Sequence, residues 1–165
     1  MRKVIVISGV TSGVGEELSR TFIDLDWSVV GLARNKEKLK KLTHELGKNF
    51  TGIETDITDE NSVAAAFNFI NSQFKKITLL VNNAAIFKMG KFSQCSFNDI
   101  NSMIDTNLKG AMYCTLEAVQ IMKASKHSAR IINVASVAAI HGIAGQAIYC
   151  ASKFGLNGFS EALNQ

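Results

Sequence analysis

Proline is absent from the 165 residues, although an average usage of about 5% would give roughly eight. The three cysteines are an odd number without close pairing, so they indicate neither a disulfide framework nor a zinc site, and we expect no metal. No apolar run approaches the roughly 20 residues that span a bilayer. We therefore expect a protein with no membrane segment.

We also expect no secretory signal. Arg2 and Lys3 precede an apolar stretch, but that stretch breaks at Ser8-Gly9 and no small-residue cleavage site follows. The sequence therefore predicts a cytoplasmic location.

Positive charge is in modest excess and is not concentrated. The net charge is +4 and the isoelectric point is about 9.0, but the densest group of lysines, at positions 36–41, shares its predicted helix with Glu37 and Glu45. A solvated helix face explains this group better than a nucleic-acid surface, and we expect no nucleic-acid partner. With 47% hydrophobic and 19% charged residues, the chain is predicted to form one globular domain over residues 1–165 that buries about 70% of its unfolded surface.

Strand patterns and helix patterns alternate along the whole chain. Short β-branched runs predict strands at residues 4–7, 28–33, 50–55, 77–81 and 130–135. Apolar residues at helical spacing predict helices at about 14–25, 36–46, 59–74, 98–124 and 148–165. This alternation predicts an α/β fold, a doubly wound parallel sheet with right-handed crossovers and helices on both faces.

The glycine-rich stretch from Ser8 to Gly15 follows the first predicted strand and opens the first predicted helix. Glycine lets a backbone approach a phosphate closely, and the helix N-terminus behind it offers unpaired N–H groups. A strand, a glycine turn and a helix predict a dinucleotide site. The spacing is Gly-x-x-x-Gly-x-Gly, however, and a tight strand-to-helix turn without a ligand is the alternative.

Small or polar residues end the predicted strands, where ligands of such sheets bind. These are the glycine turn, Ala33-Arg34, Asp56, the stretch 82–85 and Ser136. Tyr149 and Lys153 lie four residues apart on the last predicted helix and so share a face. A nearby cation favours the ionised form of a phenol, which makes the pair suitable for acid–base chemistry. In the alternative interpretation the tyrosine ring packs and the lysine is solvated.

The chain resembles the short-chain dehydrogenase/reductase family over its whole length. The resemblance rests on the glycine pattern, the Asp56 position, the Asn-Asn-Ala stretch at 82–84, Asn107, Ser136, and the Tyr-x-x-x-Lys of Tyr149 and Lys153. It implies an extended Rossmann fold with strand order 3-2-1-4-5 in three α/β/α layers. It also implies hydride transfer between a nicotinamide cofactor and a carbonyl or secondary alcohol.

The resemblance implies a role for each matching residue. Tyr149 exchanges a proton with the substrate, Ser136 binds the substrate oxygen, Lys153 binds the nicotinamide ribose, and Asn107 holds a water. Asp56 binds the adenine amino group, and Asn83 braces the fourth strand. The expected catalytic residues are Asn107, Ser136, Tyr149 and Lys153. The expected cofactor-binding residues are Gly9, Thr11, Ser12, Gly13, Val14, Gly15, Arg34, Asn35, Asp56, Ile57, Asn83, Ala84, Ala85, Tyr149 and Lys153.

The end of the second predicted strand favours NADP(H) over NAD(H). NAD-type sites place an acidic residue there to bind the ribose 2′-hydroxyl. Here Ala33 holds that position and Arg34 follows, and arginine is suited to binding a phosphate. We therefore expect NADP(H) as the preferred cofactor and NAD(H) as the alternative.

The sequence departs from the family in two respects. Ala85 stands where the family usually has glycine, and members resemble one another well beyond residue 165. We therefore expect a truncated version of a longer protein, with the strand at 130–135 as a bare sheet edge. A catalytically inactive nucleotide-binding module is the alternative to an active reductase.

Further expectations concern partners and the site's surroundings. By resemblance, the helix at 98–124 and the last helix pair with their copies, which predicts a homodimer or homotetramer. His141, Phe87 and Met89 are candidates for substrate contact, with solvated or anchoring roles as the alternatives. Cys150 is expected only to pack.

Overall fold

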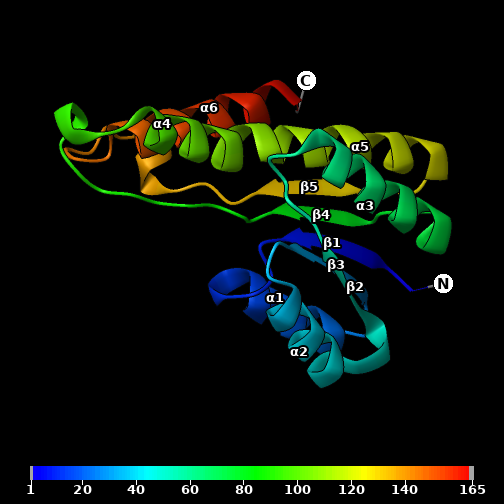
Figure 1. The fold of residues 1–165 in the computed structure, drawn as a ribbon. Coiled ribbons are helices and arrows are strands. Elements are labelled where there is room, and N and C mark those ends of the chain that lie inside the picture. The colour runs from blue at the N-terminus through cyan, green and yellow to red at the C-terminus, as the bar shows by residue number, and fades with distance from the viewer. Residues whose placement is uncertain (1, 164–165) are drawn as a thin grey trace.

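Five parallel strands form the central sheet of the computed structural model, which describes residues 2–163 (Figure 1). The spatial order of the strands is β3-β2-β1-β4-β5. The strands are β1 (Val4–Ser8), β2 (Ser28–Ala33), β3 (Phe50–Glu54), β4 (Leu79–Asn82) and β5 (Arg130–Asn133). The predicted fold class and strand order are confirmed, and β5 lies at an edge of the sheet.

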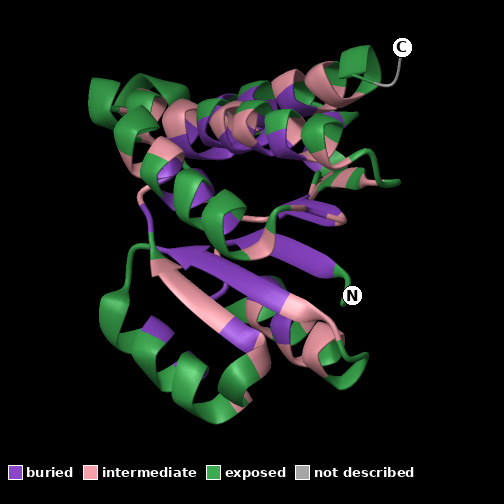
Figure 2. Cartoon of the chain, turned by 90° about the vertical axis from the view of Figure 1, so that its right-hand side faces the viewer, coloured by how far each residue is buried: buried purple, intermediate pink, exposed green. Residues whose placement is uncertain are grey.

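Helices cover both faces of the sheet (Figure 1). The helices are α1 (Gly13–Asp24), α2 (Lys36–Leu46), α3 (Glu60–Phe74), α4 (Phe97–Ile104), α5 (Gly110–Ser125) and α6 (Ala147–Leu163). One apolar core lies between the sheet and α3 and α5, and a second lies between the sheet and α1 and α2. All five residues of β1 and all four residues of β4 are buried, which explains their apolar sequences (Figure 2). The predicted last two helical residues, 164 and 165, lie outside the described residues.

The carboxyl ends of neighbouring strands meet at one edge of the sheet. In the parallel register, Ser8 of β1 lies beside Leu32 of β2, and Asn82 of β4 lies beside Asn133 of β5. The segments that follow these strands therefore converge, as the positions of the predicted site residues require.

The predicted helix over 98–124 is interrupted. Residues Asp105–Lys109 form a turn of π-helix between α4 and α5. The bulge contains Asn107, whose buried side chain is bonded to the backbone of the loop after β4. Such bulges insert one residue into a helix and often occur at functional sites.

A chain of side-chain hydrogen bonds through two asparagines connects α6 and α5 to the sheet. Asn133 Nδ2 donates to Ser160 Oγ of α6 at 2.7 Å, and Asn82 Nδ2 donates to Asn133 Oδ1 at 2.8 Å. Asn82 Nδ2 also donates to Thr115 Oγ1 of α5 at 2.9 Å. These bonds connect β4 and β5 to the two helices that cover them.

The turn from β1 into α1 depends on two glycines that leave no room for a side chain. Gly9 has a φ of +76°, and a Cβ there would lie 2.8 Å from Ala84 Cα. A Cβ on Gly15 would lie 2.3 Å from the carbonyl oxygen of Gly9 and 2.6 Å from Asn83 Nδ2. Gly13 differs, because its φ is +55° but the space around it is open. Glycine is therefore required by packing at positions 9 and 15 and by conformation at position 13.

We predict that Gly15→Ala destabilises the protein by about 1–3 kcal/mol, because the methyl group forces the turn backbone to move. Gly158→Ala is the matched control, since Gly158 is an exposed helical glycine and a Cβ added there would meet nothing within 4 Å. It should raise the free energy of unfolding by about 0.5–1 kcal/mol. Urea unfolding followed by circular dichroism measures both changes. Equal effects of the two substitutions would contradict this account of the turn.

Candidate functional site

A cleft of about 550 Å³ opens at the carboxyl ends of the strands on both sides of β1. Most of the predicted cofactor-binding residues line it: Gly9, Thr11, Ser12, Val14, Arg34, Asn35, Asp56, Ile57, Asn83, Ala84 and Ala85. Gly13, Gly15, Tyr149 and Lys153 do not line it. Ala33, which the sequence places at a ligand-binding strand end, also lines it. Five further lining residues were not predicted from the sequence: Leu32, Thr55, Thr58, Ile86 and Thr106. The structure thus brings the glycine turn together with the ends of β2, β3 and β4.

The floor of this cleft is held by Asn83. Its Nδ2 donates to the carbonyl oxygens of Ser8 at 3.0 Å and Gly9 at 3.2 Å. In return, Ser8 Oγ accepts from the backbone N–H groups of Asn83 and Ala84, each at 3.1 Å. The loop after β4 is therefore tied to the turn after β1. The resemblance predicted that Asn83 braces the fourth strand, and these bonds are the contacts through which it can do so.

Arg34 and Asp56 follow neighbouring strands, β2 and β3, and lie beside one another in the lining of the cleft. Arg34 is exposed, and its NH1 lies 4.0 Å from Asp56 Oδ2. The other oxygen of Asp56 accepts from the Thr58 backbone N–H at 2.9 Å and from Thr58 Oγ1 at 2.8 Å. Asp56 is thus fixed in place by its own loop, and Arg34 keeps donors free to bind an anion. The adenine contact expected for Asp56 stays a prediction.

Lys153 lies buried on the inner side of α6, next to Tyr149. The residue is only 3% exposed, and its Nζ donates to the Val134 carbonyl at 2.8 Å. The same Nζ lies 5.8 Å from the centre of the Tyr149 ring. Burial lowers the pKa of Lys153 below that of an ordinary lysine. The alternative interpretation of a solvated lysine is wrong for this residue.

The Tyr149 ring is half-buried, with Phe87 packed edge-on against it at 4.9 Å between centroids. Ser136 follows β5 in extended conformation, and its Oγ accepts from the Ala138 backbone N–H at 3.2 Å. A hydroxyl that accepts a bond still has its own proton to donate.

His141 is exposed, and Cys150 is buried with its sulfur against the backbone of residues 141 and 143.

Asn107 fixes the loop that follows β4. Its Oδ1 accepts from the Ile86 backbone N–H at 2.8 Å, and its Nδ2 donates to the Ile86 carbonyl at 2.9 Å and to Ser152 Oγ at 3.1 Å. The Asn107 amide thus bonds both the backbone N–H and the carbonyl of Ile86, as a neighbouring strand would, and it connects Ile86 to Ser152 on α6. Both the oxygen and the nitrogen of the amide bond protein groups. The relay water expected at Asn107 stays a prediction.

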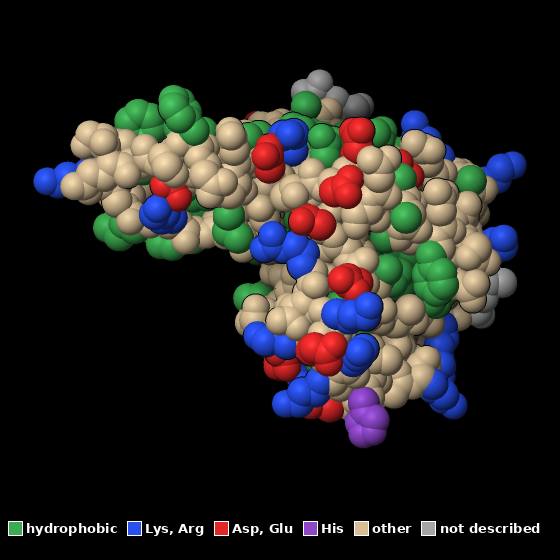
Figure 3. Space-filling model, viewed as in Figure 1, with side chains coloured by type: hydrophobic (Ala, Val, Ile, Leu, Met, Phe, Trp, Pro, Cys, Tyr) green, Lys and Arg blue, Asp and Glu red, His purple; other side chains and the backbone are tan. Residues whose placement is uncertain are grey.

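Apolar side chains are exposed where the loops after β4 and β5 project beside α4 (Figure 3). Phe87 and Met89 are 54% and 64% exposed, and Val137 and Ile140 are 68% and 61% exposed. The two loops are joined by a hydrogen bond from the Gly90 N–H to the Gly145 carbonyl at 2.9 Å. This apolar surface borders the Tyr149 ring through Phe87.

Neither a membrane span nor a metal cluster is found in the part of the chain that the structure describes. Within residues 2–163 no helix combines the length and the apolar character needed to cross a bilayer. Across the same residues, no three side chains of His, Cys, Asp or Glu are grouped so as to hold a metal ion.

The sheet order, the glycine turn and the cleft above it define a Rossmann-type nucleotide-binding fold. The model of the short chain dehydrogenase family matches residues 3–165, and this chain belongs to that oxidoreductase family. The resemblance found in the sequence is thereby confirmed.

Relatives with assigned names align along almost the whole chain. A serine 3-dehydrogenase of Agrobacterium fabrum is 35% identical over 99% of this chain. A 3-oxoacyl-[acyl-carrier-protein] reductase of Salmonella typhimurium is 32% identical over 98%. The chain spans only 65% and 66% of the lengths of these two relatives.

Solved structures with bound dinucleotides share the fold. A short chain dehydrogenase/reductase from Burkholderia phymatum in complex with NAD has a TM-score of 0.94 and 28% identity, over 98% of this chain and 59% of that one. ElxO with NADP bound has a TM-score of 0.89 and 29% identity, over 96% of this chain and 65% of that one.

We predict that Asn107→Ala lowers the free energy of unfolding by about 2–4 kcal/mol, because it leaves the N–H and carbonyl of Ile86 without partners. Asn101→Ala is the matched control, since Asn101 is exposed on the same helical segment. It should change stability by less than about 0.5 kcal/mol. Urea denaturation measures both. An Asn107→Ala protein as stable as the control would show that the loop after β4 does not depend on this amide.

Proposed function

We propose that this chain carries the cofactor-binding and catalytic residues of an oxidoreductase that transfers a hydride between NADP(H) and a carbonyl or secondary alcohol. The observation that carries the proposal is the buried ammonium of Lys153 beside the Tyr149 ring, on a fold whose neighbouring strand ends form a cleft. Burying an ammonium group costs free energy, and buried titratable groups with shifted pKa values cluster at functional sites. The Tyr149–Lys153 pair is therefore a strong candidate for acid–base chemistry.

The residues of the cleft fit a dinucleotide. There is no room for side chains at Gly9 and Gly15, so the turn backbone packs closely against the loop after β4. The space around Gly13, at the first turn of α1, is open. The backbone N–H groups there suit a pyrophosphate. Relatives of known structure bind either NAD or NADP, so the choice depends on this chain's own residues. Arg34, with Ala33 in place of an acidic residue, supports NADP(H).

The proposed chemistry divides between the cofactor and four residues. NADP(H), when bound, supplies or accepts the hydride. Tyr149 donates its phenolic proton to the oxygen of a carbonyl being reduced, or accepts the proton of an alcohol being oxidised. Ser136 has a hydroxyl proton free to bond the same oxygen, and Lys153 has donors left for a ribose and a charge that favours the phenolate. Asn107 holds the Ile86 backbone at the cleft's wall.

A second candidate is a nucleotide-binding module without turnover. It is favoured by one observation, that neither Tyr149 nor Lys153 lines the cleft. In this second proposal, nucleotide binding depends on the cleft and not on the Tyr149–Lys153 pair. Binding and turnover must be measured on the same protein to decide between the two functions.

We predict that Tyr149→Phe lowers the rate of NADPH oxidation with a panel of ketones by about 10²–10⁴-fold, because the general acid is lost. NADPH binding, followed by fluorescence titration, should be unchanged. Tyr113→Phe is the matched control, since it removes the hydroxyl of the other tyrosine, on α5, and should leave the rate unchanged. Normal turnover in Tyr149→Phe would contradict the proposed role, and NADPH binding without turnover in the unchanged chain would favour the module.

A further inference from the structure

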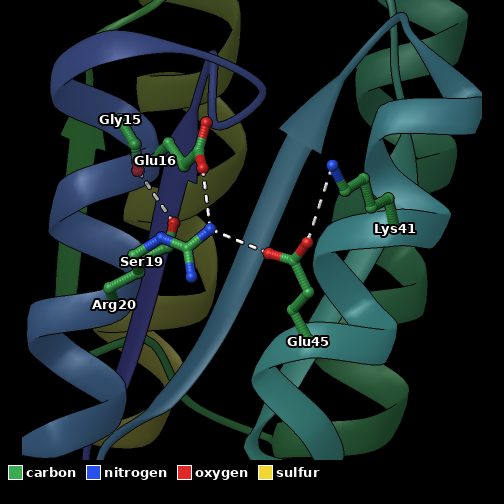
Figure 4. Close-up of polar contacts among 6 residues, drawn as sticks. All are labelled: Gly15, Glu16, Ser19, Arg20, Lys41 and Glu45. Atoms are coloured by element: carbon green, nitrogen blue, oxygen red, sulfur yellow. Dashed lines mark hydrogen bonds and ion pairs between the residues drawn. The ribbon is translucent and has the colours of Figure 1, made fainter.

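Polar side chains join the helices of this fold to their neighbours in two different ways. Arg20 of α1 lies 2.8 Å from Glu16 on the same helix and 2.9 Å from Glu45 of α2 (Figure 4). These three side chains are each more than a third exposed, so water and salt screen the ion pairs. The helix that carries Tyr149 and Lys153, α6, is instead joined to the sheet by partly buried hydrogen bonds.

Within residues 2–163, two such bonds join α6 to β5 and to the residue that follows β5. Lys153 Nζ donates to the Val134 carbonyl at 2.8 Å, and Asn133 Nδ2 donates to Ser160 Oγ at 2.7 Å. Lys153 and Ser160 are seven residues apart, about two turns of helix, so they lie on the same face of α6. Because two points on one face are fixed, α6 cannot rotate about its axis or slide along β5 without breaking one of the bonds.

The partner of Ser160 is itself fixed to the neighbouring strand. Asn133 Oδ1 accepts from Asn82 Nδ2 at 2.8 Å, and the Val134 N–H donates to the Asn82 carbonyl at 2.9 Å. Asn82 is buried and lies on β4, which has a strand on either side. The end of β5 is therefore a firm support, and Ser160 connects α6 to it.

The position of the Tyr149–Lys153 pair relative to Ser136 depends on how α6 lies against β5. The 5.8 Å from Lys153 Nζ to the centre of the Tyr149 ring is set within α6, because both residues belong to that helix. Ser136 belongs to the other side, since it follows the last residue of β5 by three positions. A misplacement of about 1 Å between reacting groups can cost about 10²-fold in rate.

We propose that Ser160 is a positioning residue, which through its bond to Asn133 holds the Tyr149–Lys153 pair in place relative to Ser136. The inference rests on the proposed function, because it concerns the same acid–base pair. The Ser160 hydroxyl accepts from Asn133 and donates to the Leu156 carbonyl at 2.7 Å, so it is engaged in both directions.

The test compares Ser160→Ala with Ser160→Thr, which keeps a hydroxyl at the same position. Both Asn133 and Ser160 line a groove of about 910 Å³, where water can replace the lost hydroxyl, so the alanine variant should fold. Asn157→Ala is the matched control, because Asn157 lines the same groove but bonds Glu161 of its own helix, at 2.8 Å. Circular dichroism checks the fold of each variant.

Two quantities are measured in each protein. Steady-state kinetics with NADPH and a ketone give kcat and KM, and fluorescence titration gives the dissociation constant of NADPH. NMR titration of isotope-labelled lysine side chains gives the pKa of Lys153, whose signal is assigned by its loss in Lys153→Arg. The second measurement does not require turnover.

We expect Ser160→Ala to lower kcat about tenfold, while KM and the dissociation constant of NADPH change less than about twofold, because the cleft is lined by other residues. Burial lowers the pKa of Lys153, so a loosened α6 that lets water reach the ammonium should raise that pKa toward the value of an exposed lysine. Ser160→Thr should restore both quantities, and Asn157→Ala should change neither.

In a chain that turns over a ketone, a change in kcat or in the pKa of Lys153 without the other would overturn the assignment of Ser160. Equal effects of Ser160→Ala and Asn157→Ala would also overturn it, as would a threonine variant as impaired as the alanine variant. If the unchanged chain turns over no ketone, the proposed function fails. The pKa of Lys153 in the same variants then still decides whether Ser160 positions the lysine.

Discussion

The side-chain amide of Asn83 is the contact on which the arrangement of the cleft depends. It holds the Ser8 and Gly9 carbonyls while Ser8 Oγ holds the backbone N–H groups of Asn83 and the residue after it. This reciprocal set of bonds brings two segments that are about 75 residues apart in sequence into backbone contact. The contact is so close that only glycine fits at positions 9 and 15. The shape of the cleft above the turn therefore depends on the Asn83 amide and on glycine at positions 9 and 15.

The cleft and the acid–base pair are positioned by different parts of the fold. The cleft is built by the turns after β1 to β4, whereas Tyr149 and Lys153 are placed by α6 and by the Val134 carbonyl after β5. The amide chain from Ser160 to Thr115 holds α6 against the sheet edge. Asn107 connects the two parts, since it bonds both Ile86 in the wall of the cleft and Ser152 on α6.

The sequence was sufficient for the fold and for most of the cleft, because both depend on local patterns. Buried β-branched strands, helical spacing and glycines after β1 each have a signature that can be recognised within a few residues. Long-range partners have no such signature. The bond between Asn107 and Ile86, and with it the π-helical turn, depends on packing between segments 21 residues apart.

Hydrogen exchange of the backbone amides with and without NADPH tests the central claim most directly, because it locates the bound dinucleotide without requiring turnover. Exchange should slow in residues 8–15, 32–35, 55–58 and 83–86, which surround the cleft. Segments far from it, such as the end of α5 and residues 126–133, which include β5, should exchange at the same rate in both conditions. Slowing confined to residues 126–133, or no change around the glycine turn at saturating NADPH, would contradict this prediction.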